Sequence, residues 1–154
     1  VKLVDKERNE IIITGRTKHF LSLVGEHLSV DNMNNAIEMA SEELNIDIPE
    51  FTVAGVPHGS FFAHEWYVAT DDAVDVKQLA EVLDQKLKIL NDDYEVERKH
   101  ALKAVSVYAL PEQVFMNFMR SKGKVGGQNK FPRVLKGKLL EEWKQFLKQQ
   151  AVLT

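Results

Sequence analysis

The sequence PEFTVAGVPHGSFFAHEWYVATD, residues 49–71, predicts the β-hairpin around which we expect the rest of the chain to fold. Its first half is a strand that Pro57 and Gly59 bring to an end, and its second half has large residues at alternate positions. The alternating residues are Phe62, His64, Trp66 and Val68. Because alternate side chains of a strand point to the same face, the hairpin is predicted to have one aromatic face.

Amphipathic helices are predicted on both sides of this hairpin. Upstream, Ser29 or Asp31 can cap a helix that ends near Asn45, and downstream Asp75 can cap a second helix of about four turns. Their apolar residues recur at the spacing that core burial requires: Met33, Ile37, Ala40 and Leu44 in the first, and Val76, Leu79, Leu83, Leu87 and Leu90 in the second. The charged segment NDDYEVER, residues 91–98, then predicts an acidic turn.

The second half of the chain predicts one more strand and two more helices. Residues 101–110 are rich in Val, Ala and Leu on both faces, which is typical of a central strand. Pro111 suits the first position of a helix, and Pro132 precedes a last one. The apolar residues expected to dock these helices on the sheet are Val114, Phe115, Phe118 and Met119, and then Leu139, Leu140, Trp143, Phe146 and Leu147.

The start of the chain predicts a separate small hairpin. Residues 1–5 and 10–14 are β-type runs joined by a charged connection of hairpin length, and a polar pivot between Gly15 and Gly25 follows. Since Val1 lies inside a predicted strand, we expect the chain to be a fragment of a longer protein. The fold class is α+β, with an N-terminal β-hairpin and hinge followed by a small mixed sheet of about three strands covered by helices.

The stretch RSKGKVGGQNKFPRVLKGK, residues 120–138, is the candidate binding segment. It contains seven Lys or Arg and no acidic residue, and glycines at 123, 126 and 127 allow the backbone to approach a ligand closely. Because charges beyond about 10 Å are screened, this local cluster, and not the net charge of −3, would attract a phosphate or carboxylate. A solvated lysine-rich surface loop is the alternative.

Composition excludes several other classes of protein. The 154 residues contain no cysteine, which rules out disulfides and is compatible with the cytoplasmic location that we expect. No apolar run approaches the roughly 18 residues of a membrane span, so no membrane contact is expected. The surface outside the basic stretch is acidic and would repel nucleic-acid phosphates, so we expect no nucleic-acid partner.

Common catalytic and metal motifs are missing as well. The five histidines show no metal-ligand spacing, so no bound metal is predicted for this domain. No Gly-x-Ser-x-Gly elbow is present, and residues 123–130 lack both the spacing and the final hydroxyl of a P-loop.

Two groups of residues resemble a known family. Gly15, Arg16, Lys18 and Gly25 are similar to the hinge motif of the adenylate-forming enzyme superfamily, in which Asp is common where this chain has Lys18. Tyr94, residues 121–123, Gln128, Lys130, Pro132 and Arg133 resemble the C-terminal domain of the auxin-responsive acyl-acid amido synthetases. Under this resemblance, residues 1–28 are the β-hairpin and hinge region and residues 29–154 are one compact α+β C-terminal lid domain.

The resemblance implies a ligase that forms an acyl-adenylate from ATP and a carboxylic acid and then transfers the acyl group to an amino-acid amine. ATP would be bound mainly by the enzyme's own N-terminal domain, with Mg as a candidate ion in the full-length enzyme, and the fragment alone is expected to be inactive. Lys130 is implied as the catalytic cation, while the superfamily pattern of Pro132, Gly137 and Lys138 implies Lys138. The two assignments compete, and we favour Lys130 narrowly.

Three further residues are candidates for contacts with the cofactor. Arg16 could contact ribose or phosphate, and Lys18 could change environment as the lid rotates. Arg133 is a third candidate, although it could instead hold the basic stretch against Asp92, Asp93 or Glu95. The alternative function is a free-standing binding module that holds an anionic metabolite or an acidic partner through the basic stretch. Neither substrate can be named from this chain.

Overall fold

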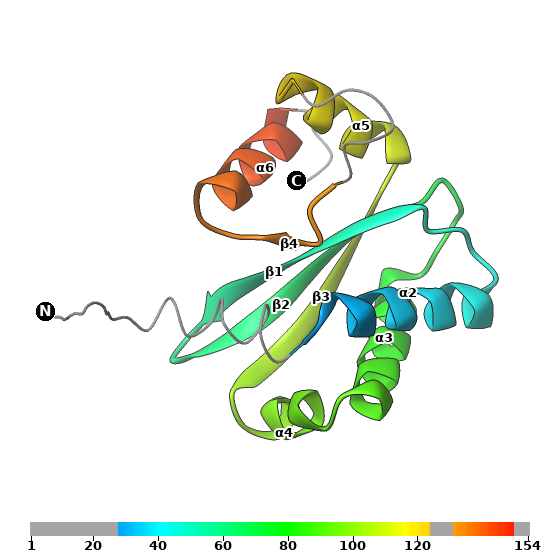
Figure 1. Ribbon diagram of the computed structural model, residues 1–154, viewed down its shortest axis with the longest axis vertical. Coiled ribbons are helices and arrows are strands. Elements are labelled where there is room, and N and C mark those ends of the chain that lie inside the picture. The colour runs from blue at the N-terminus through cyan, green and yellow to red at the C-terminus, as the bar shows by residue number, and fades with distance from the viewer. Residues whose placement is uncertain (1–27, 124–130, 150–154) are drawn as a thin grey trace, which may run out of the picture.

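A four-stranded sheet with helices on both faces forms the centre of the molecule (Figure 1). The computed structural model describes residues 28–123 and 131–149, so the predicted N-terminal hairpin and hinge lie outside the described residues apart from Leu28. The elements are α2 (Val30–Leu44), β1 (Glu50–His58), β2 (Phe61–Ala69), α3 (Val76–Leu90), α4 (Asp92–His100), β3 (Leu102–Leu110), α5 (Glu112–Ser121), β4 (Val134–Leu135) and α6 (Gly137–Gln149). The α+β class is confirmed.

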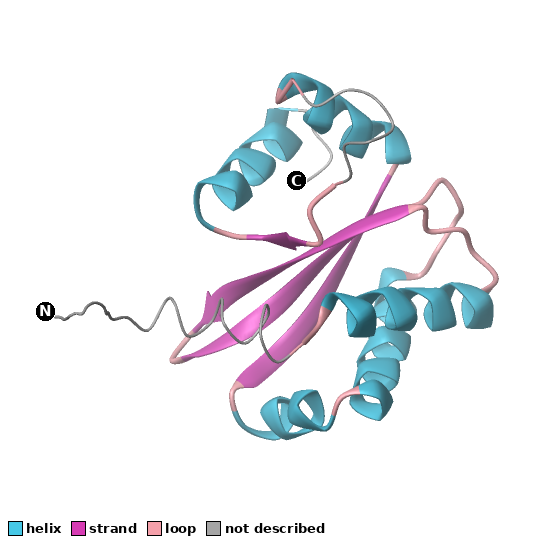
Figure 2. Cartoon of the chain, in the orientation of Figure 1, coloured by secondary structure: helices cyan, strands magenta, loops and turns pink. Residues whose placement is uncertain are grey.

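The sheet is mixed, in the order β3-β2-β1-β4 (Figure 2). The predicted hairpin is β1 and β2, which pair antiparallel from Glu50↔Ala69 to His58↔Phe61. β3 runs parallel to β2, and β4 runs parallel to β1. The prediction of a central strand at 101–110 is wrong for the described sheet, because β3 lies at its edge. It carries apolar residues on both sides because Val107 packs in the core cluster of α2 and α3 while Leu110 packs in the cluster of α5 and α6.

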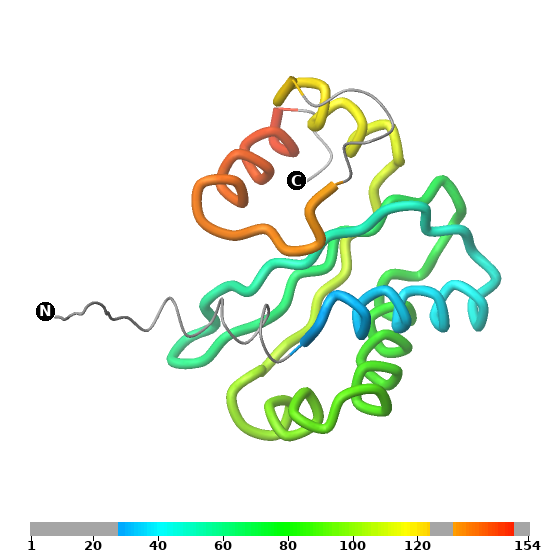
Figure 3. The backbone as a smooth tube through the Cα atoms, viewed as in Figure 1, coloured from blue at the N-terminus to red at the C-terminus, as the bar shows by residue number. Residues whose placement is uncertain are grey.

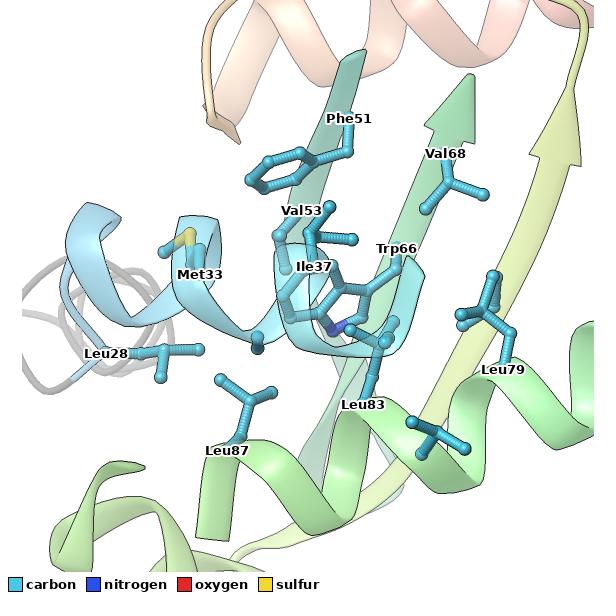
Figure 4. Packing of buried hydrophobic residues seen from close by; sticks show 14 of the residues in the cluster. Leu28, Met33, Ile37, Phe51, Val53, Trp66, Val68, Leu79, Leu83 and Leu87 are labelled. Carbon is cyan, nitrogen blue, oxygen red and sulfur yellow. The ribbon is translucent and has the colours of Figure 1, made fainter. Parts of the chain in front are cut away.

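One face of the sheet packs against α2 and α3. Figure 4 shows Phe51, Val53, Trp66 and Val68 on this face, with the apolar side chains of both helices directed at them. Trp66 is fully buried and stacks on Phe51 with ring centroids 5.8 Å apart. Each helix has the predicted cap: the Ser29 side chain accepts a hydrogen bond from the Asn32 N–H, and Asp75 accepts from two backbone N–H groups.

The opposite face packs against α5 and α6. The rings of Tyr67 on β2 and Trp143 form a T-shaped pair with centroids 5.7 Å apart. The Trp143 centroid also lies 5.0 Å from that of Phe118 and 5.1 Å from that of Phe131. The predicted apolar stripe of the last helix is therefore confirmed, since Trp143 and Leu147 are fully buried. Because β2 presents Trp66 to one layer and Tyr67 to the other, consecutive residues hold the two helical layers on one sheet.

The segment predicted as an acidic turn forms the helix α4, so that prediction is wrong. The Asn91 side chain caps it by accepting from the Tyr94 N–H at 2.9 Å. Its first turn carries acidic residues and its last turn carries Arg98, Lys99 and His100, an order that complements the helix dipole. The helix buries only Tyr94, so it has no apolar periodicity from which it could have been predicted.

A polar network holds α4 against α3. Asp84 accepts hydrogen bonds from the Tyr94 hydroxyl at 2.6 Å and from Arg98 Nε at 2.9 Å, while Arg98 Nη1 donates to the Leu102 carbonyl at 2.8 Å. His64 of β2 lies beside this network, with its ring centroid 6.2 Å from that of Tyr94. His64 is 2% exposed, and neither ring nitrogen has a hydrogen-bond partner within the described residues. Burial lowers the pKa of His64 to about 4, with a further contribution from Arg98.

We predict that His64 makes the fold sensitive to acid. Between about pH 7 and pH 4 the unfolded chain binds a proton at His64 that the folded chain excludes, so the free energy of unfolding falls as the pH falls. The loss attributable to His64 should reach about 3 kcal/mol at pH 4. His64→Leu should unfold at nearly the wild-type urea concentration at pH 7 and lose less stability at pH 4.5. Parallel pH profiles for the two proteins would contradict this.

Candidate functional site

The two ends of the basic stretch lie in the described residues, and its middle does not. Residues 120–123 and 131–138 are described, while Lys130 falls in the undescribed segment 124–130. Arg16 and Lys18 also lie outside the described residues. Of the five predicted site residues, the structure therefore places Arg133 and Lys138.

The N-terminal end of the basic stretch forms the C-terminal end of α5, with Lys122 as its C-cap. The Lys122 N–H donates to the carbonyls of Phe118 and Met119 at 3.2 and 3.1 Å, which satisfies groups that a helix end leaves unpaired. The Lys122 ammonium reaches across to α6 and pairs with Glu142 Oε1 at 2.6 Å. This ion pair joins the two helices of one layer where the basic stretch leaves α5.

The second end is held by Arg133. Its guanidinium pairs with the Glu50 carboxylate, donates through Nη1 to the Phe51 carbonyl at 3.1 Å, and donates through Nε to Asn34 Oδ1 at 3.3 Å. It also lies over the Phe51 ring, 4.3 Å from the centroid. These contacts connect Arg133 to β1 and α2.

The acidic partners predicted for Arg133 are wrong. Asp92, Asp93 and Glu95 were expected from their charge alone, but they lie in the first turn of α4 and Glu50 takes their place. Arg133 pairs with Glu50 because the backbone holds it beside β1, where the Val53 N–H donates to the Arg133 carbonyl at 2.9 Å.

Lys138 is positioned by a short strand and a glycine turn that come just before it. The strand is β4, drawn in orange beside β1 in Figure 3, and its Val134 and Leu135 pair with Val53 and Ala54 of β1. Gly137 then turns the chain into α6 with a φ of 59°, a left-handed value that glycine adopts without strain. Lys138 follows in the first turn of α6, as predicted, and its side chain is exposed.

The charges around the start of α6 favour the binding of an anion. Lys136 and Lys138 are both exposed, and Lys138 forms no ion pair within residues 28–123 and 131–149. A positive side chain in the first turn of a helix is unfavourable to the helix dipole, and a bound anion reverses that effect. A phosphate or carboxylate group could therefore be held at the start of α6.

Two carboxylates that pair with residues of the basic stretch were not predicted from the sequence. Glu142 lies four residues after Lys138, a helical spacing that was readable once the helix was predicted. Glu50 offers no comparable signal, because its contact with Arg133 spans 83 residues. The Lys122 hydrogen bond lowers the pKa of Glu142, and the positive charge of Lys138 acts in the same direction.

The described part of the chain contains neither a metal-binding cluster nor a membrane-spanning helix. Residues 28–123 and 131–149 contain no group of three or more His, Cys, Asp or Glu side chains placed to hold a metal ion. None of the described helices is both long enough and apolar enough to cross a bilayer.

The chain is similar to known proteins over most of its length. Residues 31–138 match the family model described as the GH3 family C-terminal domain. The solved structure of a GH3.15 acyl acid amido synthetase aligns with a TM-score of 0.61 at 16% identity over 77% of this chain and 23% of its own. A second, AtGH3.15 acyl acid amido synthetase in complex with 2,4-DB, aligns with a TM-score of 0.53 at 16% identity, covering 77% of this chain and 25% of its own.

The chain therefore spans about a quarter of the length of these solved proteins. At such low identity their likeness concerns the fold alone. No curated protein sequence matches the chain.

Arg133 should stabilise the fold through its pair with Glu50. Both side chains are about a quarter exposed, so Arg133→Met, which leaves Glu50 unpaired, should lower the free energy of unfolding by about 2 kcal/mol. Urea unfolding checks this, with Arg120→Met on the exposed end of α5 as a control that should change stability by less than about 0.5 kcal/mol. The double variant with Glu50→Gln should recover part of the loss, and equal effects of Arg133→Met and Arg120→Met would refute the prediction.

Gly137 should be required for the turn that presents Lys138. A Cβ at this position would meet no atom within 4 Å, so Gly137→Ala should destabilise only through its backbone, by about 1 kcal/mol. Gly137→Asn should lower the midpoint of urea unfolding less, because Asn tolerates the left-handed region better. If Ala and Asn both unfold like the wild type, the left-handed turn is not needed.

Proposed function

Because this chain belongs to the GH3 family and matches its C-terminal domain, we propose that it is the mobile C-terminal domain of an ATP-dependent acyl-acid amido synthetase. The family match over residues 31–138 carries this proposal. The solved relatives are named as acyl acid amido synthetases, and their fold agrees with it. In this proposal the domain works in the cytoplasm against its own N-terminal domain, and the chain alone is inactive.

The proposed reaction has two steps. A carboxylate oxygen of the acyl acid attacks the α-phosphorus of ATP, and the bond to the bridging oxygen breaks, which gives acyl-adenylate and pyrophosphate. An amino-acid amine then attacks the acyl carbon, AMP leaves with the bonding electrons, and the amine loses a proton as the amide forms. Negative charge grows on the departing pyrophosphate in the first step, so a positioned cation accelerates it.

Two lysines of the basic stretch are candidates for that cation. The resemblance to the amido synthetases favours Lys130 as the cation. The superfamily pattern of Pro132 and Gly137 followed by lysine favours Lys138. What supports Lys138 is its environment: it is exposed, it is fixed by β4 and Gly137, and it has an anion-favouring position at the start of α6.

The remaining predicted residues take supporting roles in this proposal. Arg16 and Lys18 belong to the hinge about which the domain rotates. A contact between Arg133 and the cofactor would require its guanidinium to leave Glu50 and Phe51, so we assign Arg133 to structural support. Exposed lysines beside a turn suit the phosphates of ATP. A magnesium ion would be supplied with the nucleotide by the rest of the enzyme.

The test is to change each lysine in the full-length enzyme. Either Lys130→Ala or Lys138→Ala should reduce the rate of pyrophosphate release by about 100-fold or more, because a charge that stabilises the transition state is lost. Binding of the carboxylic acid, measured by calorimetry, should change little, since the lysine acts on phosphate.

Lys148→Ala provides the control, because Lys148 is an exposed lysine in the last turn of α6. Wild-type pyrophosphate release by both Lys130→Ala and Lys138→Ala would contradict the proposal. A panel of carboxylic acids and amino acids in the same assay would identify the substrates.

A further inference from the structure

Three charged side chains lie near the end of α5 and the first two turns of α6. Lys138 and Glu142 are separated by four residues on α6, and Lys122 extends to Glu142 from the end of α5. The Lys122 ammonium lies 2.6 Å from Glu142 Oε1, and the two side chains are 32% and 33% exposed. A charged pair at this distance is a short, charge-assisted hydrogen bond.

Without Lys122, the natural partner of Glu142 would be Lys138. Side chains four residues apart on a helix are neighbours, and a lysine and a glutamate at that spacing attract each other. In the structure Lys122 takes the carboxylate, and Lys138 forms no ion pair with any described residue. The Lys122 hydrogen bond is the main cause of the lowered pKa of Glu142, which agrees with Lys122 being the partner of this carboxylate.

We propose that Lys122 is a positioning residue that occupies Glu142 and so leaves the Lys138 ammonium available to a phosphate group. This inference rests on the proposed function, in the version where Lys138 meets the phosphates of ATP. The charges of Lys122 and Glu142 cancel locally, so the start of α6 presents the uncompensated charges of Lys136 and Lys138. Loss of Lys122 would leave a free carboxylate one turn away and lower the positive potential where the anion binds.

The experiment measures pyrophosphate release by the full-length enzyme with a charge-swapping set of variants. Lys122→Met keeps most of the length of the side chain and removes its charge. It should lower kcat/KM for ATP about threefold, the effect of one uncompensated charge about 7 Å away in water. Adding Glu142→Gln should return kcat/KM to within about 1.5-fold of wild type, because the competing carboxylate is then neutral. At 0.5 M salt the loss in Lys122→Met should shrink, because screening weakens the effect of the carboxylate.

Lys144→Met is the matched control, since it removes a lysine of α6 that, like Lys122, pairs with a carboxylate, here Glu65 Oε1 at 3.2 Å. It should leave kcat/KM unchanged. If the ion pair merely held α5 against α6, the double variant would stay as impaired as Lys122→Met, and the inference would be overturned. Thermal unfolding of each variant shows that the enzyme remains folded.

The outcomes separate this inference from the proposed function. Lys138→Ala alone should reduce pyrophosphate release strongly, because the lysine that meets the phosphate is lost. If Lys138→Ala is active and Lys130→Ala is inactive, the domain assignment survives and this inference fails. If neither lysine matters, the proposed function fails with it.

Discussion

The described sheet is apolar on both faces, and this constraint determines where the helices lie. Trp66 and Tyr67 are consecutive residues of β2, yet each is buried in a different cluster of side chains. One face is covered by α2 and α3, which flank the hairpin in sequence. The other face is covered by α5 and α6, which come later in the chain. The basic stretch connects those last two helices. Its position is therefore a consequence of covering the second face.

The parts of the fold that could be predicted have strong local signals. The hairpin follows from the alternation at Phe62, Trp66 and Val68, and the helices α2 and α3 follow from their caps at Ser29 and Asp75. In contrast, α4 is stabilised by charge order and by contacts with Asp84, which leave no apolar period to detect. The two-residue strand β4 depends wholly on β1, from which it is remote in sequence. Such long-range pairing cannot be read from local composition.

The same distinction between local and long-range signals applies to the residues of the candidate site. That Lys138 begins a helix was predictable from Pro132 and the apolar stripe after it. The partner of Arg133 was not, because several carboxylates satisfy a charge rule and only the β4 pairing brings Glu50 within reach. The ion pair between Lys122 and Glu142 likewise depends on how α5 packs beside α6. Lys130, Arg16 and Lys18 lie outside the described residues and remain predictions from the family resemblance.

The division of the aromatic residues between the two faces has a practical consequence. The chain has two tryptophans, and each is fully buried in its own layer: Trp66 against α2 and α3, and Trp143 among Phe115, Phe118 and Phe131. Replacing either one leaves a single tryptophan, whose emission reports on one layer. In the variant that keeps Trp143, emission would follow the packing of Phe131 against it, and the variant that keeps Trp66 would serve as a separate reference for the other layer.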